Sequence, residues 1–475
     1  MHDVLIQNSL TRKTDKIVPI ENNEVKIYCC GPTVYNYAHI GNLRTYVFED
    51  ILVKTLKAAG YKVKHVMNIT DVGHLTGDGD DGDDKMLLAA EKEHAGVLDI
   101  ARKYEKIFFE HTHALGLARP DVVCRATEHV QEMIDFVKGL EEKGYAYFAG
   151  GNVYFDTSKF KDYGKLSGQK REDLRHGARV DQDTNKRNPS DFVLWFTTSK
   201  FENQILQWDS PWGRGYPGWH IECSAMAMKY LGDRVDIHCG GIDHIPVHHE
   251  NEIAQSEGYL GHHWVNNWVH SEFLQVKDGK MSKSAGNFLT LDVLTEKGYR
   301  PEHYKYFCLG AHYKSQLLFS FDSMDAAKSA YENLLKKIAL WKENQQQPDA
   351  AAQKVSQAKL SEYINNFDNF MFDDLKTPQA LSVVWTLVKD NDVVNADKLK
   401  FIEHIDAVFS LNLLTNKPEE QDVEITPEVS AIIEERRQAR LNKNWAKSDE
   451  LRDKLKAMGY GIKDIAGNEV EITKL

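Results

Sequence analysis

A strand, a turn and a helix follow one another near the start of the chain, and this order constrains the fold most. Residues 25–30 are mostly apolar and predict a buried strand, residues 31–33 are Gly-Pro-Thr and predict a turn, and residues 43–60 have helical periodicity. The string His-Ile-Gly-Asn at residues 39–42 precedes that helix. Because backbone N–H groups and the helix dipole attract anions, this junction predicts a phosphate site; an ordinary helix start is the alternative.

A second string, Lys-Met-Ser-Lys-Ser, occupies residues 280–284, about 240 residues after the first. It lies between Gly279 and Gly286, so we expect a loop whose two lysines close over phosphate and open again after pyrophosphate forms. The four-residue string alone occurs by chance in many chains, and the five-residue string is more specific. Both strings in this order, with a strand and a turn before the first, resemble the class I aminoacyl-tRNA synthetases.

The bulk properties of the chain are typical of a large enzyme. Its 475 residues are enough for about three domains with an ample core. Its six cysteines are too sparse for a disulfide framework, which favours a reducing compartment. The first residues lack a basic region followed by an apolar run, and no later stretch approaches about 18 uninterrupted apolar residues. We therefore expect a cytoplasmic protein without a membrane partner.

The order of strand and helix patterns predicts an α/β fold with several parts. Strand patterns at residues 25–30, 62–68 and 235–239, each next to a helix pattern, predict a Rossmann-like parallel sheet that is interrupted by an insertion. Leucine-rich helical periodicity then predicts an α-helical bundle, followed by a small C-terminal domain. The predicted ranges are the first half of the catalytic domain at 1–120, a connective insertion at 121–212, the second half at 213–270, a stem-contact region with the second string at 271–320, the bundle at 321–415 and the C-terminal domain at 423–475.

A basic segment lies near the end of the chain, although the net charge of the whole chain is −12. Residues 436–456 contain eight Lys or Arg and three Asp or Glu, with helical periodicity. Such a net charge argues against coating by nucleic acid, yet a local basic face can bind phosphate. The candidates for tRNA phosphate contacts are Arg436, Arg437, Arg440 and Lys443; a solvated helix face is the alternative.

Four residues from distant parts of the sequence combine the ligand types of a metal site. Cys30 ends the first predicted strand, and Cys223 lies near a helix start, where the dipole favours a thiolate. His248 and Glu252 are four residues apart on one predicted helix and therefore share a face. Two thiolates, an imidazole and a carboxylate suit Zn²⁺. From spacing alone, the cysteines could instead be small core residues and the histidine part of a polar helix start.

The order of five motifs along nearly the whole chain narrows the resemblance to the cysteinyl-tRNA synthetase family. They are Cys-Gly-Pro-Thr-Val-Tyr at 30–35, Asn-Ile-Thr-Asp at 68–71, Trp-His-Ile-Glu-Cys-Ser at 219–224, His-His-Glu-Asn-Glu at 248–252 and the string at 280–284. The resemblance implies that one Zn²⁺ binds the thiolate of substrate cysteine, and that its ligands are Cys30, Cys223, His248 and Glu252. Zinc binding of the thiolate would reject serine, whose hydroxyl is far harder to deprotonate.

The same resemblance assigns roles to residues around that metal. It implies an amino-acid pocket that contains Gly31, Thr70 and Trp219. It implies binding of ATP, with Mg²⁺, by Thr33, His39, Gly41, Asn42 and Lys283. Catalysis would consist of positioning and of stabilising phosphate charge, because the attacking carboxylate is already ionised, and the residues for it are His39, Asn42, Lys280 and Lys283.

Two residues depart from the usual pattern of that family. Asn42 stands where the commoner form of the first string has a second histidine, and asparagine can still donate a hydrogen bond to phosphate. Cys239 stands where a glycine is usual; it is either a packed thiol, which we expect, or a competing metal ligand.

The activity that the resemblance implies is the ATP-dependent, AMP-forming ligation of L-cysteine to tRNA(Cys) by a monomer, with the region beyond residue 321 serving tRNA. Two alternatives are weighed against it. A cysteine ligase of the mycothiol pathway also adenylates cysteine but joins it to an amino sugar, and that family lacks an anticodon module. A noncatalytic tRNA-binding protein on a degenerate synthetase fold would commonly have lost the two ATP strings, which this chain retains.

Overall fold

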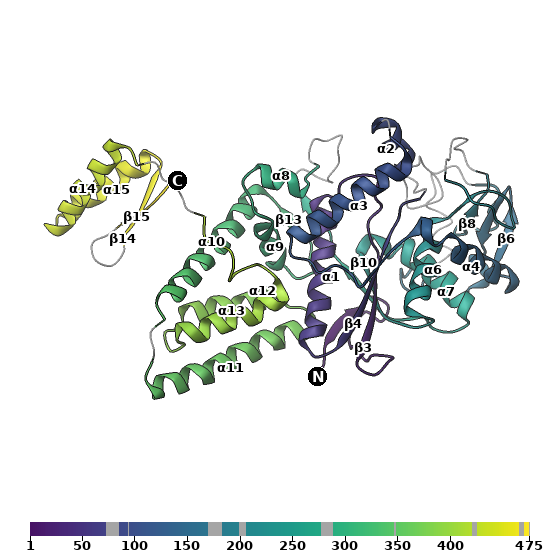
Figure 1. The fold of residues 1–475 in the computed structure, drawn as a ribbon, viewed down its shortest axis with the longest axis horizontal. Helices are drawn as coiled ribbons and strands as arrows, with labels where there is room; N and C mark the ends of the chain where they lie inside the picture. Colours follow the sequence, from purple (N-terminus) through teal and green to yellow (C-terminus); the bar gives the residue numbers. More distant parts are fainter. Residues whose placement is uncertain are drawn as a thin grey trace. The chain divides into compact units, whose positions relative to one another are not determined.

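The computed structural model describes residues 1–72, 85–93, 95–169, 183–198, 206–276, 288–345, 348–419, 425–464 and 470–474. These residues form two units, Met1–Asn416 and Lys417–Leu475, and each unit has a hydrophobic core of its own (Figure 1). Within the described ranges, no helix is both long enough and apolar enough to cross a bilayer.

A five-stranded parallel sheet forms the centre of the first unit. The strands lie in the order β11-β10-β3-β4-β5, and their bounds are β3 Glu24–Cys29, β4 Lys62–Ile69, β5 Val122–Arg125, β10 Val235–Gly241 and β11 Val265–Ser271. The predicted Rossmann-like sheet is therefore confirmed. The strands expected at 25–30, 62–68 and 235–239 were visible in the sequence because a parallel sheet is buried on both faces.

The strand order reverses beside β3, which pairs with β10 on one side and with β4 on the other. From β3 the chain passes through α1 (Ile40–Ala58) to β4, whereas from β10 it passes through α7 (His248–Leu260) to β11. The carboxyl ends of β3 and β10 consequently border a crevice, which is where open α/β sheets bind ligands. Cys30 follows β3 directly and lies at this position.

Helix α1 begins at Ile40 and not near residue 43, because His39 caps it. The backbone N–H of Asn42 donates to Nδ1 of His39 at 3.1 Å, and the backbone N–H of His39 donates to Oδ1 of Asn42 at 3.2 Å. This reciprocal capping satisfies two backbone donors at the helix start. Helix α1 then runs beside the sheet (Figure 1).

Two helices, α6 (Trp219–Leu231) and α7, cover the face of the sheet opposite α1, next to the crevice. Helix α6 packs against α7 and also contacts β3 and β4. Other helices and strands of the first 320 residues are β1 Leu5–Asn8, β2 Lys13–Lys16, α2 Lys85–Glu93, α3 Val97–Ala114, β12 Leu274–Val276, α8 Leu291–Glu296, α9 Pro301–Leu309 and β13 Leu317–Phe319.

A four-stranded antiparallel sheet lies between the two halves of the parallel sheet in sequence. It consists of β6 Ala146–Ala149, β7 Asn152–Phe155, β8 Phe192–Phe196 and β9 Tyr216–Pro217, and α4 (Val130–Glu142) packs against it. The insertion predicted at 121–212 differs from this arrangement at both ends, because β5 pairs with β4 of the parallel sheet and β9 lies beyond residue 212. A strand of four residues such as β5 is too short to be assigned from periodicity.

Four helices follow β13, where a bundle was predicted: α10 Phe321–Glu343, α11 Ala350–Phe372, α12 Thr377–Lys389 and α13 Asn395–Phe409. Their core is continuous with that of the sheet, since Phe367 of α11 and Phe401 of α13 belong to the same buried cluster as Ile27 of β3 and Leu52 of α1. A chain that ends near residue 320 would expose this shared face and lose part of its core.

The second unit is a helix pair with a hairpin. α14 (Pro427–Leu441) packs against α15 (Trp445–Ala457), and the antiparallel strands β14 (Tyr460–Asp464) and β15 (Val470–Lys474) follow. The small core of the unit consists of the buried side chains of Val429, Ile432, Leu451 and Leu455.

Candidate active site

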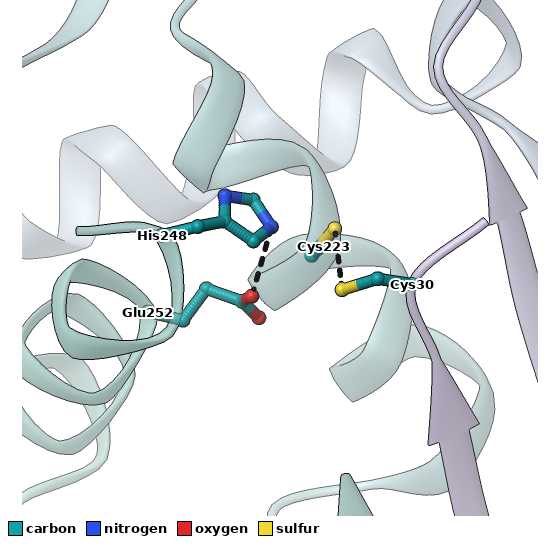
Figure 2. Close-up of side chains that lie close together, drawn as sticks. All are labelled: Cys30, Cys223, His248 and Glu252. Atoms are coloured by element: carbon teal, nitrogen blue, oxygen red, sulfur yellow. Dashed lines mark hydrogen bonds and ion pairs between the residues drawn. The ribbon is translucent and has the colours of Figure 1, made fainter. Parts of the chain in front are cut away.

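The four predicted metal ligands lie together at the crevice (Figure 2). Cys30 comes from the end of β3, Cys223 from the start of α6, and His248 and Glu252 from successive turns of α7. The sulfur atoms of the two cysteines are 4.0 Å apart, and Nε2 of His248 lies 3.1 Å from Oε1 of Glu252. One ligand atom from each of the four lies within 4.8 Å of the others, and all four side chains are buried. The arrangement can hold one metal ion.

The chemistry of these side chains fits a cation. Among the described residues, Oε1 of Glu252 is buried and makes no well-aligned hydrogen bond, although Nε2 of His248 lies 3.1 Å away. Burying a carboxylate oxygen in this way is costly unless a positive ion compensates. Burial raises the pKa of both thiols, those of Cys30 and Cys223, so each would be protonated without a cation beside it. Two sulfur, one nitrogen and one oxygen donor are a set that Zn²⁺ accepts.

Two further histidines surround the quartet and were not singled out from the sequence. Nε2 of His238 donates to Oε2 of Glu252 at 3.0 Å, and Nε2 of His249 lies 3.3 Å from Sγ of Cys30. Together with Cys30 and Glu252 they form a second set of possible ligands. The tandem histidines at 248 and 249 can be seen in the sequence. The contact of His238 with Glu252 cannot, because it requires β10 and α7 to lie side by side.

A cavity of about 260 Å³ joins the metal ligands to the predicted amino-acid pocket. Cys30, Cys223 and His248 line it together with the three predicted pocket residues, Gly31, Thr70 and Trp219. The indole ring of Trp219 stacks on the imidazole ring of His248, with ring centroids 4.0 Å apart. Glu252 does not line the cavity and is fully buried.

The backbone of Gly31 approaches that of Asn68 too closely for any side chain. A Cβ atom on Gly31 would lie 1.7 Å from the carbonyl oxygen of Asn68. The backbone N–H of Gly31 donates to Oδ1 of Asn68 at 2.8 Å, and the backbone of Thr70 bonds to both Pro32 and Val34. Glycine is therefore required where the segments after β3 and β4 meet.

The first sequence string opens onto the same cavity. Thr33, His39 and Asn42 line it, whereas Gly41 lies in the first turn of α1 without lining it. Because Nδ1 of His39 accepts the backbone N–H of Asn42, the imidazole in its neutral form carries its proton on Nε2. Oδ1 of Asn42 is also engaged in the cap.

The second string lies outside the described residues, so the structure does not place Lys280 or Lys283. The chain is described again from Phe288, whose ring contacts that of His39 edge to face with centroids 5.8 Å apart. The backbone N–H of Ile40 donates to the carbonyl oxygen of Leu289 at 2.8 Å. Phe288 and Leu289 therefore lie directly beside the first string.

Cys239 is not among the ligands that the structure gathers. It is buried beside Cys29, its partner in the register of β10 and β3, in the core cluster that includes α1. Cys30 belongs to a different cluster, on the side of α6. The expectation of a packed thiol at Cys239 is confirmed.

The four basic residues predicted to contact tRNA have different surroundings in the second unit. Arg436 is only 1% exposed, and its two terminal nitrogens donate to Asp464 at 2.7 and 2.9 Å. Arg440 donates to the same carboxylate at 2.7 Å, while Arg437 and Lys443 are exposed. The prediction of a phosphate-facing surface therefore needs correction at Arg436, which lies inside the unit.

Comparisons with known proteins decide the family. The model of the class I (C) tRNA synthetase catalytic domain matches residues 16–329, and the cysteinyl-tRNA ligase anticodon-binding domain matches residues 422–469. A curated cysteine–tRNA ligase of Treponema denticola is 51% identical, over 97% of this chain and 98% of the relative. This chain belongs to the cysteine–tRNA ligase family. The cysteine–tRNA ligase of Borrelia hermsii is 45% identical, over 95% of this chain and 96% of that one.

Solved structures agree on the fold of this cysteine–tRNA ligase family member. A methionyl-tRNA synthetase of Mycobacterium tuberculosis in complex with methionyl-adenylate superposes with a TM-score of 0.55, covering 82% of this chain and 90% of that one. A putative arginyl-tRNA synthetase of Campylobacter jejuni gives a TM-score of 0.51, covering 84% of this chain and 94% of that one. Both are 14% identical in sequence, so they support the class I synthetase fold alone.

Proposed function

We propose that this chain activates L-cysteine with ATP to cysteinyl-adenylate and transfers the cysteinyl group to the 3′ end of tRNA(Cys). The observation that carries the proposal is that one cavity is lined by three of the candidate metal ligands, Cys30, Cys223 and His248, and also by His39, which caps α1. A thiol-bearing amino acid and a nucleoside triphosphate would bind there side by side. The family assignment points the same way.

The metal of this proposal is zinc, one per chain, held by Cys30, Cys223, His248 and Glu252. When bound, it supplies a soft cationic centre that prefers a thiolate over the hydroxyl of serine. His238 would orient Glu252 through its contact with Oε2, because hydrogen bonds of this kind to a metal ligand fix the geometry of that ligand.

The residues at the start of α1 would act on the phosphates. The ionised carboxylate of cysteine attacks the α-phosphorus of ATP, and the bond to the leaving pyrophosphate breaks, so no residue has to remove a proton. Nε2–H of His39, the amide nitrogen of Asn42 and the first backbone N–H groups of α1 would bind phosphate oxygens, with Mg²⁺ accompanying the nucleotide. Lys280 and Lys283 would close over the same phosphates.

The region beyond residue 321 is proposed to serve tRNA, with the C-terminal domain at 423–475 binding the anticodon. The match of residues 422–469 to an anticodon-binding domain supports this role. Arg437, Arg440 and Lys443 are the remaining candidates for phosphate contacts. A cytoplasmic monomer is part of the same proposal, as are the predicted domain ranges apart from the two bounds of the insertion, which the structure corrects.

The test has two stages. The purified chain is first assayed for cysteine-dependent exchange of labelled pyrophosphate into ATP, with serine as the negative control. Charging of tRNA(Cys) is then measured with the same preparation. Exchange and charging would support the proposal; exchange without charging, but with transfer to an amino sugar, would support the mycothiol-type ligase. Absence of exchange with tRNA binding retained would identify a noncatalytic tRNA-binding protein.

A further inference from the structure

A buried chain of hydrogen bonds leads from Glu222 to the cavity wall. Glu222 is fully buried in the first turn of α6, and its Oε2 accepts the hydroxyl of Thr70 at 2.9 Å. The hydroxyl oxygen of Thr70 in turn accepts Nδ2 of Asn68 at 3.2 Å. Oδ1 of Asn68 accepts the backbone N–H of Gly31 at 2.8 Å. Glu222 itself does not line the cavity, whereas the other three residues do.

This chain of bonds determines what the Thr70 hydroxyl can offer a ligand. A free hydroxyl rotates and serves as donor or acceptor. Here the proton of Thr70 points to Glu222 and one lone pair faces Asn68, so only an acceptor remains for the cavity. The backbone of Thr70 cannot turn to change this, because its N–H donates to Pro32 O at 3.1 Å and its carbonyl accepts Val34 N–H at 3.2 Å.

We propose that Glu222 is a positioning residue for substrate binding: through Thr70 it presents an oriented acceptor to the α-ammonium group of cysteine. The inference rests on the proposed function, in which free cysteine occupies the cavity. Of the polar groups of cysteine at neutral pH, the carboxylate accepts hydrogen bonds, the metal-bound sulfur has lost its proton, and the ammonium alone donates. Glu222 acts without touching the substrate, because Thr70 lies between them.

The experiment compares Glu222→Leu, which removes the acceptor, with Glu222→Gln, which keeps one. The assay is cysteine-dependent pyrophosphate exchange, after the wild-type protein has shown this activity; a wild type without exchange would contradict the proposed function and not this inference. We expect Glu222→Leu to raise KM for L-cysteine by about 10-fold, the loss of one hydrogen bond to a charged group, while KM for ATP and kcat stay within about twofold. Glu222→Gln should restore most of the affinity. If Glu222→Leu is not obtained folded, Glu222→Ala replaces it.

Two readouts separate this role from a merely structural one. Thr70→Val should raise KM to the same extent, and the double variant with Glu222→Leu should be no worse than Thr70→Val alone. Competitive inhibition by 3-mercaptopropionate, which lacks the ammonium group, should be the same for wild type and Glu222→Leu. Asp236→Asn is the matched control, because Asp236 is equally buried and accepts two backbone N–H groups, of Ile20 and Lys26, away from the cavity.

Three outcomes would overturn the inference. Additive effects of Thr70→Val and Glu222→Leu would mean that Glu222 does not work through Thr70. Equal weakening of cysteine and 3-mercaptopropionate would place the effect on the thiol or carboxylate. An unchanged KM in Thr70→Val would assign the ammonium to another acceptor, such as the carboxylate of Asp243 in the same cavity.

Discussion

Replacing Gly31 by alanine should impair cysteine activation, because the structure leaves no space for one methyl group. The added Cβ would lie 1.7 Å from the carbonyl oxygen of Asn68 and 2.8 Å from its carbonyl carbon. Both backbones are held, since Gly31 N–H donates to Oδ1 of Asn68 and Thr70 N–H donates to Pro32 O. Favourable contacts between heavy atoms lie near about 3.5 Å, so the two segments must separate by more than about 1 Å.

This separation has a cost that can be measured in two ways. Overpacking of a well-packed site costs about 1–3 kcal/mol of stability, and a displacement of about 1 Å near reacting atoms costs about 10²-fold in rate. We therefore expect a folded Gly31→Ala protein with a lowered Tm and with kcat/KM for L-cysteine reduced by about 10²-fold in pyrophosphate exchange. Gly96→Ala is the control: Gly96 has φ −70°, and among the described residues its added Cβ comes close to the carboxylate of Asp99, an exposed side chain that can move away. Wild-type Tm and kcat/KM in Gly31→Ala would refute the reasoning.

Four further predictions follow from the site and the fold. Elemental analysis should find about one zinc per chain in the wild type and little in Cys30→Ala or Cys223→Ala, and full zinc content in both variants would disprove the ligand assignment. Lys283→Ala should slow adenylate formation by about 10² to 10³-fold with little change in cysteine affinity, and unchanged exchange would show that the second string is structural. A chain ending at Asn416 should stay folded, keep exchange and lose tRNA charging, because the first unit has a complete core of its own. Burial lowers the pKa of Lys305 to about 8, so between about pH 8 and 10.5 the unfolded chain binds more protons than the folded one. The free energy of unfolding of the wild type, measured by chemical denaturation, should therefore rise relative to that of Lys305→Met as the pH rises from about 7 towards 10, and a difference that does not change with pH would contradict this.

The central strands of the sheet could be predicted from the sequence, while its edge strands could not. β3, β4 and β10 are buried on both sides and give apolar runs that predict strands directly. Edge strand β11 contains polar residues whose partners lie in distant segments: Nδ2 of Asn267, for example, donates to Asp236 O at 3.0 Å. Sequence patterns do not show that such side chains are satisfied by tertiary contacts, so β11 was missed.

The residue types of the metal quartet could be predicted, whereas its surroundings could not. His248 and Glu252 share a helix face because of their spacing alone, and Cys30 follows from its place at the end of a strand. His238 has no comparable signal, since its contact with Glu252 exists only when α7 packs over β10. The same holds for Glu222, whose contact with Thr70 joins residues 152 positions apart in the sequence.

Arg436 is buried because of its position on the helix, although its charge alone suggested an exposed residue. Val429, Ile432 and Ala439 are buried along one stripe of α14, and Arg436 lies on the same stripe, four residues after Ile432 and three before Ala439. A cation at such a position needs a buried or half-buried partner, and Asp464 of β14 supplies one with two hydrogen bonds. Removing Arg436 would therefore disturb the unit itself, and Arg440 shares the same carboxylate. Exposed Arg437 and Lys443 are consequently the pair whose neutralisation tests phosphate binding. The slope of log affinity for tRNA against log salt should become shallower, because binding releases fewer counterions when the protein contacts fewer phosphates.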